Sequence, residues 1–249
     1  MAATALSEVI VVENPARLAR TAAEWVVRRL RDVAARNRVT FALAGGSTPR
    51  LLYQALATEM AHRVPWERIE FYFGDERCVP PADAESNYRM AEEALFRGHL
   101  VDGGKVHRMA GEEADVDAAA AEYGIELPPA LDLLLLGVGP DGHTCSLFPG
   151  QPALDEKVRR VVAVKDAPKP PPARLTITPP VIAAARSVLV LCAGRDKAQA
   201  VQSALEGPLD ARACPAQLAR HGTWILDRAA AAQLSSSTGP TGASGERKT

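Results

Sequence analysis

The sequence predicts a single α/β domain with a mostly parallel central sheet, helices on both faces and a Rossmann-like order of elements. Short apolar runs alternate along the chain with segments whose apolar residues recur at helical spacing. Glycine-rich breaks follow several of the apolar runs, as they do where a strand turns into a helix. The length of 249 residues, with 47% hydrophobic and 24% charged residues, suits one such domain.

The first half of the chain alternates helices and strands in a regular way. A helix is expected from Pro15 to about Ala35, because Leu18, Ala22 and Val26 share one face, with Asn14 as its cap. The elements expected next are a strand at 39–44, a helix at 49–61, a strand at 69–73 and a helix at 86–96.

The second half continues the alternation and ends in a segment of different composition. The elements expected there are a short strand at 106–109, a helix at 116–123, strands at 131–136, 158–164, 175–178 and 187–192, a helix at 196–205 and a strand at 223–227. A proline-rich loop, 166–172, separates two of these strands. After Leu234 serine, threonine, glycine and proline dominate, so we expect one domain at 1–234 and a disordered tail at 235–249.

Composition argues against several classes of protein. The chain has 29 Lys and Arg against 30 Asp and Glu, a net charge of −1, whereas a nucleic-acid-binding surface needs a basic excess. Its apolar runs are too short to span a bilayer, and its N-terminus lacks the pattern of a secretory signal. The four cysteines form no CxxC pair, which indicates a reducing compartment. We therefore expect a cytoplasmic protein, a monomer that binds neither nucleic acid nor membrane.

Polar clusters follow several of the predicted strands, where parallel sheets bind their ligands. The loop Gly45, Gly46, Ser47 and Thr48 joins a strand to a helix. Glycines allow close backbone approach, and the free N–H groups at a helix start favour an anion such as phosphate. The alternative for this loop is an ordinary strand-to-helix turn with a Ser or Thr cap.

A second cluster follows the strand at 131–136 and formally matches GxGxxG, the pattern of a dinucleotide site. Pro149 and Pro152 leave no room for the crossover helix that a dinucleotide site needs. The glycines are better explained as a loop that presents Asp141 and His143, a carboxylate and a base two residues apart. The alternative for His143 is a structural hydrogen bond within the loop.

Further charges lie at other predicted strand ends. Asp75, Glu76 and Arg77 follow one strand, Arg174 lies beside the proline-rich loop, and Lys197 opens a helix. Arginine suits bidentate contact with phosphate and can stabilise an oxyanion, although each of these charges could also be a solvated surface residue. Cys145 lies close to His143, but without a second orienting motif we interpret it as a small buried residue and not as a nucleophile.

Together these motifs resemble the 6-phosphogluconolactonases of the glucosamine-6-phosphate isomerase/6-phosphogluconolactonase superfamily. The resemblance covers roughly residues 9–228 and is specific because several blocks occur in the right order. The blocks are Ala44 to Pro49, Asp75 to Arg77 with Val79-Pro80 and Ser86-Asn87, Gly137 to Thr144 with Ser146 to Pro149, Lys169 to Pro172 with Arg174 to Thr176, and Gly194 to Lys197.

The resemblance implies hydrolysis of 6-phospho-D-glucono-1,5-lactone, the second step of the oxidative pentose phosphate pathway. It implies His143 as general base, Asp141 as the group that orients it, and Arg77 as a ligand of substrate oxygens and of the oxyanion. The residues it implies for substrate and phosphate binding are Gly45, Gly46, Ser47, Thr48, Asp75, Arg174 and Lys197. No metal or organic cofactor is implied, and the sequence offers no cluster of metal ligands.

Two other functions stay open. The amino-sugar isomerase branch resembles this chain, but it carries a catalytic glutamate after its Asp-Gly-His block, where this chain has Ser146 to Pro149 without a carboxylate. A non-catalytic sugar-phosphate sensor would need an attached DNA-binding domain, and the first 14 residues are too short for one. Cys145 is itself a departure from the lactonase pattern, where alanine is usual, and we expect it to change volume but not chemistry.

Overall fold

The computed structural model of the chain describes residues 8–98 and 105–235. Positions 236–249 of the predicted tail lie outside the described residues. At its first position, the N–H and the hydroxyl of Ser235 donate to a carboxylate oxygen of Glu206 at 2.8 and 2.6 Å. Within the described residues, no helix is both long and apolar enough to cross a membrane.

The core of the fold is a six-stranded sheet in which every neighbouring pair of strands is parallel. Its order is β1-β9-β8-β5-β2-β3. The strands are β1 (Val9–Val12), β2 (Val39–Leu43), β3 (Ile69–Phe73), β5 (Leu133–Gly137), β8 (Val188–Cys192) and β9 (Thr223–Asp227). Strands buried on both faces read as continuous apolar runs, which explains why β5 has the sequence LLLLG. The predicted parallel sheet is confirmed.

Within the described residues, six α-helices and several short helical turns connect the strands. The α-helices are α1 (Pro15–Ala34), α2 (Ser47–Ala57), α3 (Asn87–Ala91), α4 (Val116–Glu126), α5 (Pro179–Ala184) and α6 (Ala198–Leu205). The short turns are 3₁₀-helices at Ala61–Arg63, Trp66–Arg68, Pro152–Asp155, Arg195–Lys197 and Pro215–Ala219, and a π-helical turn at Glu92–Phe96.

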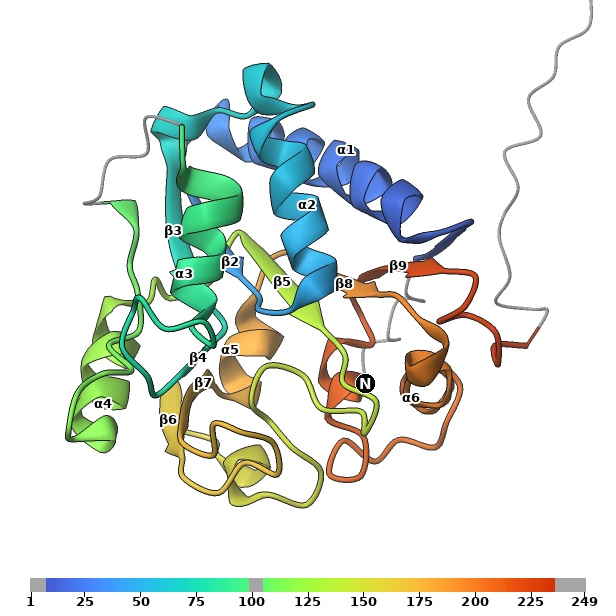
Figure 1. The fold of residues 1–249 in the computed structure, drawn as a ribbon. Coiled ribbons are helices and arrows are strands. Elements are labelled where there is room, and N and C mark those ends of the chain that lie inside the picture. The colour runs from blue at the N-terminus through green and yellow to red at the C-terminus, as the bar shows by residue number, and fades with distance from the viewer. Residues whose placement is uncertain (1–7, 99–104, 236–249) are drawn as a thin grey trace, which may run out of the picture.

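Local sequence explains where α1 begins. The Asn14 side chain accepts the Arg17 N–H at 2.9 Å, and Pro15 occupies the first helical position, where a missing N–H costs nothing. The predicted apolar face, which includes Leu18 and Val26, is fully buried. α1 packs against α2, and the two helices lie side by side in Figure 1.

The order of the strands creates one reversal in the sheet. The chain passes from β2 to β3 on one side, and then returns past β2 to β5 and moves outward through β8 to β9. Because parallel crossovers are right-handed, the connections before and after this reversal lie on opposite faces of the sheet. The reversal leaves a crevice at the carboxyl ends of β2 and β5, where doubly wound folds bind ligands.

A second, three-stranded antiparallel sheet was not expected from the sequence. It has the order β4-β7-β6, made of β4 (Asp75–Arg77), β7 (Arg174–Ile177) and β6 (Val161–Val164), and α4 packs against β6 and β7. β4 has only three residues, all of them charged, so it carries no strand pattern. This sheet brings Arg77 directly opposite Arg174.

Several predicted boundaries differ from the structure. The expected strand at 106–109 is reduced to one bridge between Val106 and Phe71, because the segment runs along the exposed edge of β3 for a single residue pair. The expected helix at 86–96 becomes π-helical from Glu92 onward. β1 and α5 were not predicted, since four and six residues are too few for a clear period.

Candidate active site

A cavity of about 310 Å³ lies at the carboxyl ends of β2, β5 and β8. Every site residue predicted from the sequence lines it, except Asp141, which reaches it through His143. The predicted residues that line it are Gly45, Gly46, Ser47, Thr48, Asp75, Arg77, His143, Arg174 and Lys197. Asn87, Lys169 and Cys145 line it as well, and they are not among the residues predicted for the site.

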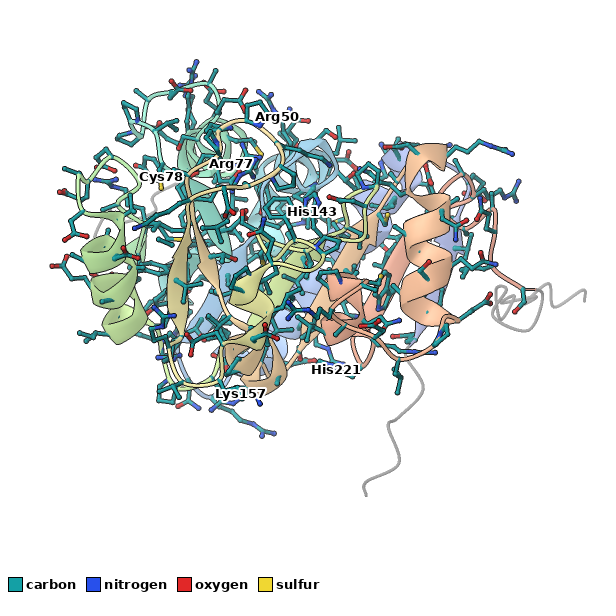
Figure 2. The ribbon with its side chains drawn as sticks, turned by 90° about the horizontal axis from the view of Figure 1, so that it is seen from below. Arg50, Arg77, Cys78, His143, Lys157 and His221 are labelled. Atoms are coloured by element: carbon teal, nitrogen blue, oxygen red, sulfur yellow. The ribbon has the colours of Figure 1, made fainter. Side chains whose placement is uncertain are left out.

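A larger open groove of about 830 Å³ runs along α1 and contains none of the predicted residues. Ala35 and Arg36 in its wall precede β2, and Arg63 precedes β3, so the groove lies toward the amino ends of these strands. Ligands of parallel sheets bind at the carboxyl ends, which favours the smaller cavity as the site of chemistry. In Figure 2 Arg77 and His143 lie in the upper half of the view, and Lys157 and His221 lie along its lower edge.

The loop between β2 and α2 has the form of an anion site. Gly46 is the N-cap of α2 with a φ of 101°, a value that favours glycine, and no side chain caps the helix. The alternative of an ordinary Ser or Thr cap is therefore wrong. Ser47 and Thr48 form the first turn, where helices leave N–H groups without an intrahelical partner. Such a turn attracts phosphate.

Two buried side chains fix this loop from behind. The Tyr53 hydroxyl donates to the Ala44 carbonyl oxygen at 2.8 Å and accepts the Ala44 N–H at 2.9 Å. Burial raises the pKa of Tyr53, so its hydroxyl stays protonated. A Cβ atom on Gly45 would lie 2.0 Å from Asn87 Oδ1, so only glycine fits at that position. The loop is thus held against α3.

Asp75 is buried and presents its carboxylate at the cavity wall. Ser146 Oγ donates to Asp75 Oδ2 at 2.7 Å, and Asn87 Nδ2 donates to Asp75 Oδ1 at 3.2 Å. Asn87 Nδ2 also donates to the Asp75 carbonyl oxygen at 2.9 Å. Each carboxylate oxygen therefore has one fixed donor, which holds the charge in a defined position beside the cavity.

Glu76 has a structural role that the charged triplet did not reveal. Its buried carboxylate accepts the backbone N–H groups of Arg77, Asn87 and Tyr88 at 2.7 to 2.8 Å, and the Ser86 hydroxyl at 3.0 Å. Burial raises the pKa of Glu76, and the four donors oppose that rise. Glu76 therefore holds β4 to the start of α3.

Replacing Glu76 with glutamine is expected to lower the free energy of unfolding by about 1–3 kcal/mol. The amide would put an NH₂ donor against N–H donors, and a buried group left without its partner costs about that much. Denaturant unfolding of Glu76→Gln measures the change, and Glu92→Gln at an exposed position of the next turn is the matched control. An unfolding free energy equal to that of the control would contradict this role.

Two arginines face each other across the antiparallel pair β4 and β7. Arg77 and Arg174 occupy the same register position, and both line the cavity. Burial and the charge of Arg77 lower the pKa of Arg174. Like charges directly opposite one another destabilise a sheet, so this placement indicates a site that receives an anion.

The two guanidinium groups have different partners. Arg77 Nη1 donates to the Glu85 carbonyl oxygen at 2.5 Å, while its buried Nε has no partner within the described residues. Arg174 Nε donates to the Pro171 carbonyl oxygen at 3.0 Å, and its Nη2 donates to the carbonyl oxygens of Lys169 and Pro170 at 3.1 and 3.2 Å. Arg174 thus also supports the proline-rich loop, a role that its position in the sequence does not indicate.

The loop after β5 brings a carboxylate and an imidazole together. Asp141 Oδ1 lies 2.5 Å from His143 Nδ1. Partial burial raises the pKa of the Asp141 carboxyl, but the hydrogen bond with His143 and the charges of His143 and Lys169 outweigh it and lower that pKa to about 2. The Phe148 ring packs against the imidazole with 4.7 Å between centroids. An ionised carboxylate on Nδ1 leaves Nε2 as the nitrogen that can accept a proton.

The glycines of this loop serve the Asp141–His143 pair. Gly139 N–H donates to the His143 carbonyl oxygen at 2.9 Å, and a Cβ atom on Gly139 would lie 2.0 Å from His143 Nδ1 and 2.5 Å from Asp141 Oδ1. The next helix is the four-residue turn Pro152–Asp155, so no crossover helix follows the GxGxxG pattern. The structure therefore agrees with the rejection of a dinucleotide site.

Two remaining lining residues complete the cavity. Cys145 has a φ of 49°, and burial raises the pKa of its thiol well above the usual value, which disfavours a thiolate nucleophile. Lys197 ends the turn before α6, and its Nζ lies 3.3 Å from Asp196 Oδ2. Its side chain is partly buried and lines the same cavity as Ser47 and Thr48 in the first turn of α2.

The family described as glucosamine-6-phosphate isomerases/6-phosphogluconolactonase matches residues 13–226. The chain belongs to this family. It is 39% identical to the 6-phosphogluconolactonase of Streptomyces coelicolor over 94% of this chain and 97% of that protein. It is 37% identical to the 6-phosphogluconolactonase of Homo sapiens over 94% of this chain and 96% of that protein.

Solved structures of the glucosamine-6-phosphate isomerase/6-phosphogluconolactonase family share the fold. The 6-phosphogluconolactonase from Trypanosoma cruzi superposes with a TM-score of 0.82 and 32% identity, over 92% of this chain and 97% of that chain. A monomeric glucosamine-6-phosphate deaminase superposes with a TM-score of 0.78 at 22% identity, over 90% of this chain and 99% of that chain. At that identity the second likeness shows the fold alone.

Proposed function

We propose that this chain hydrolyses 6-phospho-D-glucono-1,5-lactone to 6-phospho-D-gluconate, as the names of its relatives suggest. One observation carries the proposal. A carboxylate-supported imidazole lies at the same cavity as two opposed arginines, a lysine and an uncapped helix N-terminus. A base for water and a site for a phosphate are the two requirements of this reaction.

In the proposed mechanism His143 Nε2 takes a proton from a water molecule while the water oxygen attacks the lactone carbonyl carbon. Asp141 holds Nδ1–H and stabilises the imidazolium that forms. The carbonyl oxygen becomes an oxyanion, which Arg77 stabilises with donors freed from Glu85. Collapse of the intermediate breaks the bond to the ring oxygen, which receives the proton from His143.

The phosphate is proposed to bind at the first turn of α2. Gly45, Gly46, Ser47 and Thr48 would donate backbone N–H and hydroxyl groups to it. Lys197 and Arg174 would supply positive charge, and Asp75 would accept a substrate hydroxyl group. The reaction as proposed needs no metal or organic cofactor. The proposed base, oxyanion donor and phosphate site all lie on one chain, so the proposed reaction requires no second copy, and we also propose that a monomer is active. The four free cysteines favour the cytoplasm.

The amino-sugar isomerase alternative is less well supported at His143. Isomerisation requires a group that opens the sugar ring and a base that moves a carbon-bound proton. Phe148 packs against the imidazole, and Asp141 is the carboxylate that contacts it among the described residues. The sensor alternative does not account for a preformed Asp141–His143 pair.

Replacing Lys197 with alanine is expected to raise KM by about 10–100-fold with little change in kcat. A phosphate anchor binds the ground state and the transition state alike, and a charge-assisted hydrogen bond contributes about 1.5–3 kcal/mol. Initial rates across a range of lactone concentrations measure the two constants separately. Lys157→Ala, at an exposed loop at another edge of the molecule, is the control. A reduced kcat at unchanged KM would contradict a role in phosphate binding and would indicate that Lys197 acts on the transition state.

The function itself is tested by adding the protein to freshly generated lactone and measuring 6-phosphogluconate with a coupled dehydrogenase. The lactone opens spontaneously, so the rate is compared with buffer and with His143→Ala protein. A rate well above both supports the proposal. A rate equal to that of buffer, together with turnover of glucosamine 6-phosphate, would replace it with the isomerase alternative; binding without turnover of either compound would favour the sensor.

A further inference from the structure

Lys169 contacts the same carboxylate as His143, from a different segment of the chain. Its Nζ lies 3.8 Å from Asp141 Oδ1, the oxygen that also contacts His143 Nδ1 at 2.5 Å. We propose that Lys169 is a positioning residue for the reaction: it shares the Asp141 carboxylate with the imidazole and so favours the neutral form of His143, which can accept a proton from water. This inference rests on the lactonase activity proposed above.

The loop that carries Lys169 is held in place by several contacts. The Ala167 N–H donates to the Pro172 carbonyl oxygen at 2.9 Å, and Arg174 donates to the carbonyl oxygens of three successive residues, Lys169 to Pro171. Four prolines in the sequence PKPPP restrict the backbone dihedral angles further. The backbone of Lys169 is therefore fixed while its half-exposed side chain reaches toward Asp141.

The contacts around Lys169 form a closed ring of neighbouring residues that includes the Asp141–His143 pair. The Arg174 guanidinium lies 5.6 Å from the centroid of the Phe148 ring, and that ring packs on His143. His143 contacts Asp141, and Asp141 contacts Lys169. The Lys169 carbonyl oxygen accepts a hydrogen bond from Arg174, which closes the ring of contacts. Each residue of this ring therefore has two neighbours that fix its position. An isolated surface lysine would have none.

The charge of Lys169 opposes one effect of the Asp141 carboxylate on the imidazole of His143. A carboxylate beside an imidazole stabilises the protonated form, and a protonated imidazole cannot act as a base. A second cation on the same carboxylate offsets part of that stabilisation and also repels the imidazolium directly. With Lys169 present, Asp141 can orient the imidazole of His143 while stabilising its protonated form less strongly.

Other charged groups surround the pair but do not replace this contact. Among the described residues, Lys169 and His143 are the two basic side chains within 4.0 Å of an Asp141 oxygen. The remaining ionisable groups of the cavity walls are Asp75 and Arg77 on β4, Arg174 on β7, Cys145 after β5, Cys192 at the end of β8 and Lys197 before α6. The Cys214 thiol packs behind Gly142, and burial raises its pKa, so it stays neutral.

The test is the pH dependence of kcat/KM between pH 5 and 8 for the wild type, Lys169→Met and Lys169→Arg. Lactone that remains after a quench is trapped with hydroxylamine and measured as hydroxamate, so that no coupling enzyme limits the range. We expect the acidic limb of Lys169→Met to move upward by about half to one pH unit. Its rate at the alkaline plateau should stay within about threefold of wild type, and Lys169→Arg should follow the wild-type profile.

A purely structural role predicts a different result, in which Lys169→Met loses activity by the same factor at every pH. That outcome, or an acidic limb at the wild-type pH, would overturn the inference. Titration of the His143 ring followed by NMR in protein without substrate gives a second readout that does not depend on turnover, with His143→Ala to assign the signal. A wild type without lactonase activity would instead refute the proposed function, whatever the NMR titration shows.

Discussion

Replacing His143 with alanine is expected to lower kcat for lactone hydrolysis by about 10²–10⁴-fold, the range that a positioned general base contributes. The imidazole is held at Nδ1 by Asp141, and a methyl group at this position leaves no group to take the proton of the attacking water. The change leaves the proposed phosphate site intact, so KM should stay within a few-fold of wild type. Residual activity would come from binding and from oxyanion stabilisation by Arg77.

The measurement is a comparison of kcat and KM for wild type, His143→Ala and His221→Ala, after subtraction of spontaneous hydrolysis. His221 is exposed and lies just before β9, at the amino end of that strand, so its loss should change neither constant. A His143→Ala enzyme with wild-type kcat would exclude His143 as the base. Circular dichroism of the two variants checks that both are folded.

The same experiment across pH identifies which member of the pair titrates. The lowered pKa of Asp141, about 2, means that its carboxylate remains ionised between pH 5 and 8. A fall in activity as pH decreases through this range has two sources, because histidine is the side chain that ordinarily titrates there and the substrate phosphate also titrates at about pH 6. The part of the decrease that is absent from the residual rate of His143→Ala is the part that the imidazole causes.

The main sheet could be predicted from the sequence because its longer strands are mostly apolar, with Thr40 in β2 and Glu70 in β3 as polar exceptions. A glycine or a charged residue lies at or just after the end of each of them. β3 and β9 have the predicted bounds, and β5 differs by two residues at its start and one at its end. The antiparallel sheet could not be predicted in the same way. β4 consists of Asp75, Glu76 and Arg77, and its pairing with β7 depends on contacts about a hundred residues away in sequence.

The candidate site was predictable where a residue carries chemistry and lies next to a strand end. Gly45 to Thr48, Asp141 and His143 meet both conditions, and the structure brings them to one region. Lys169 and Asn87 carry chemical groups but do not lie next to a strand end, because Lys169 lies in a loop and Asn87 starts a short helix. The antiparallel sheet brings both residues close to the cavity, and the sequence around each residue does not indicate that sheet.

Replacing Gly139 with alanine is expected to lower kcat by about 10²–10³-fold, although position 139 carries no reactive group. A Cβ atom there would lie 2.0 Å from His143 Nδ1 and 2.5 Å from Asp141 Oδ1, distances that non-bonded atoms do not adopt. The imidazole must move by more than 1 Å, and a displacement of that size costs about 10²-fold in rate. The proposed phosphate site lies on other loops, so KM should change little.

Two comparisons separate this steric effect from a general loss of stability. Gly124→Ala places a methyl group in α4 with ordinary contacts of 3.8 to 4.0 Å, and it should leave kcat unchanged while favouring the helix by about 0.5–1 kcal/mol. The double variant Gly139→Ala/His143→Ala should be no slower than His143→Ala alone, because the added methyl group acts through an imidazole that is already absent. A further large decrease in the double variant would show that Gly139 acts on another part of the site, and wild-type kcat in Gly139→Ala would show that the imidazole needs no such fixed position.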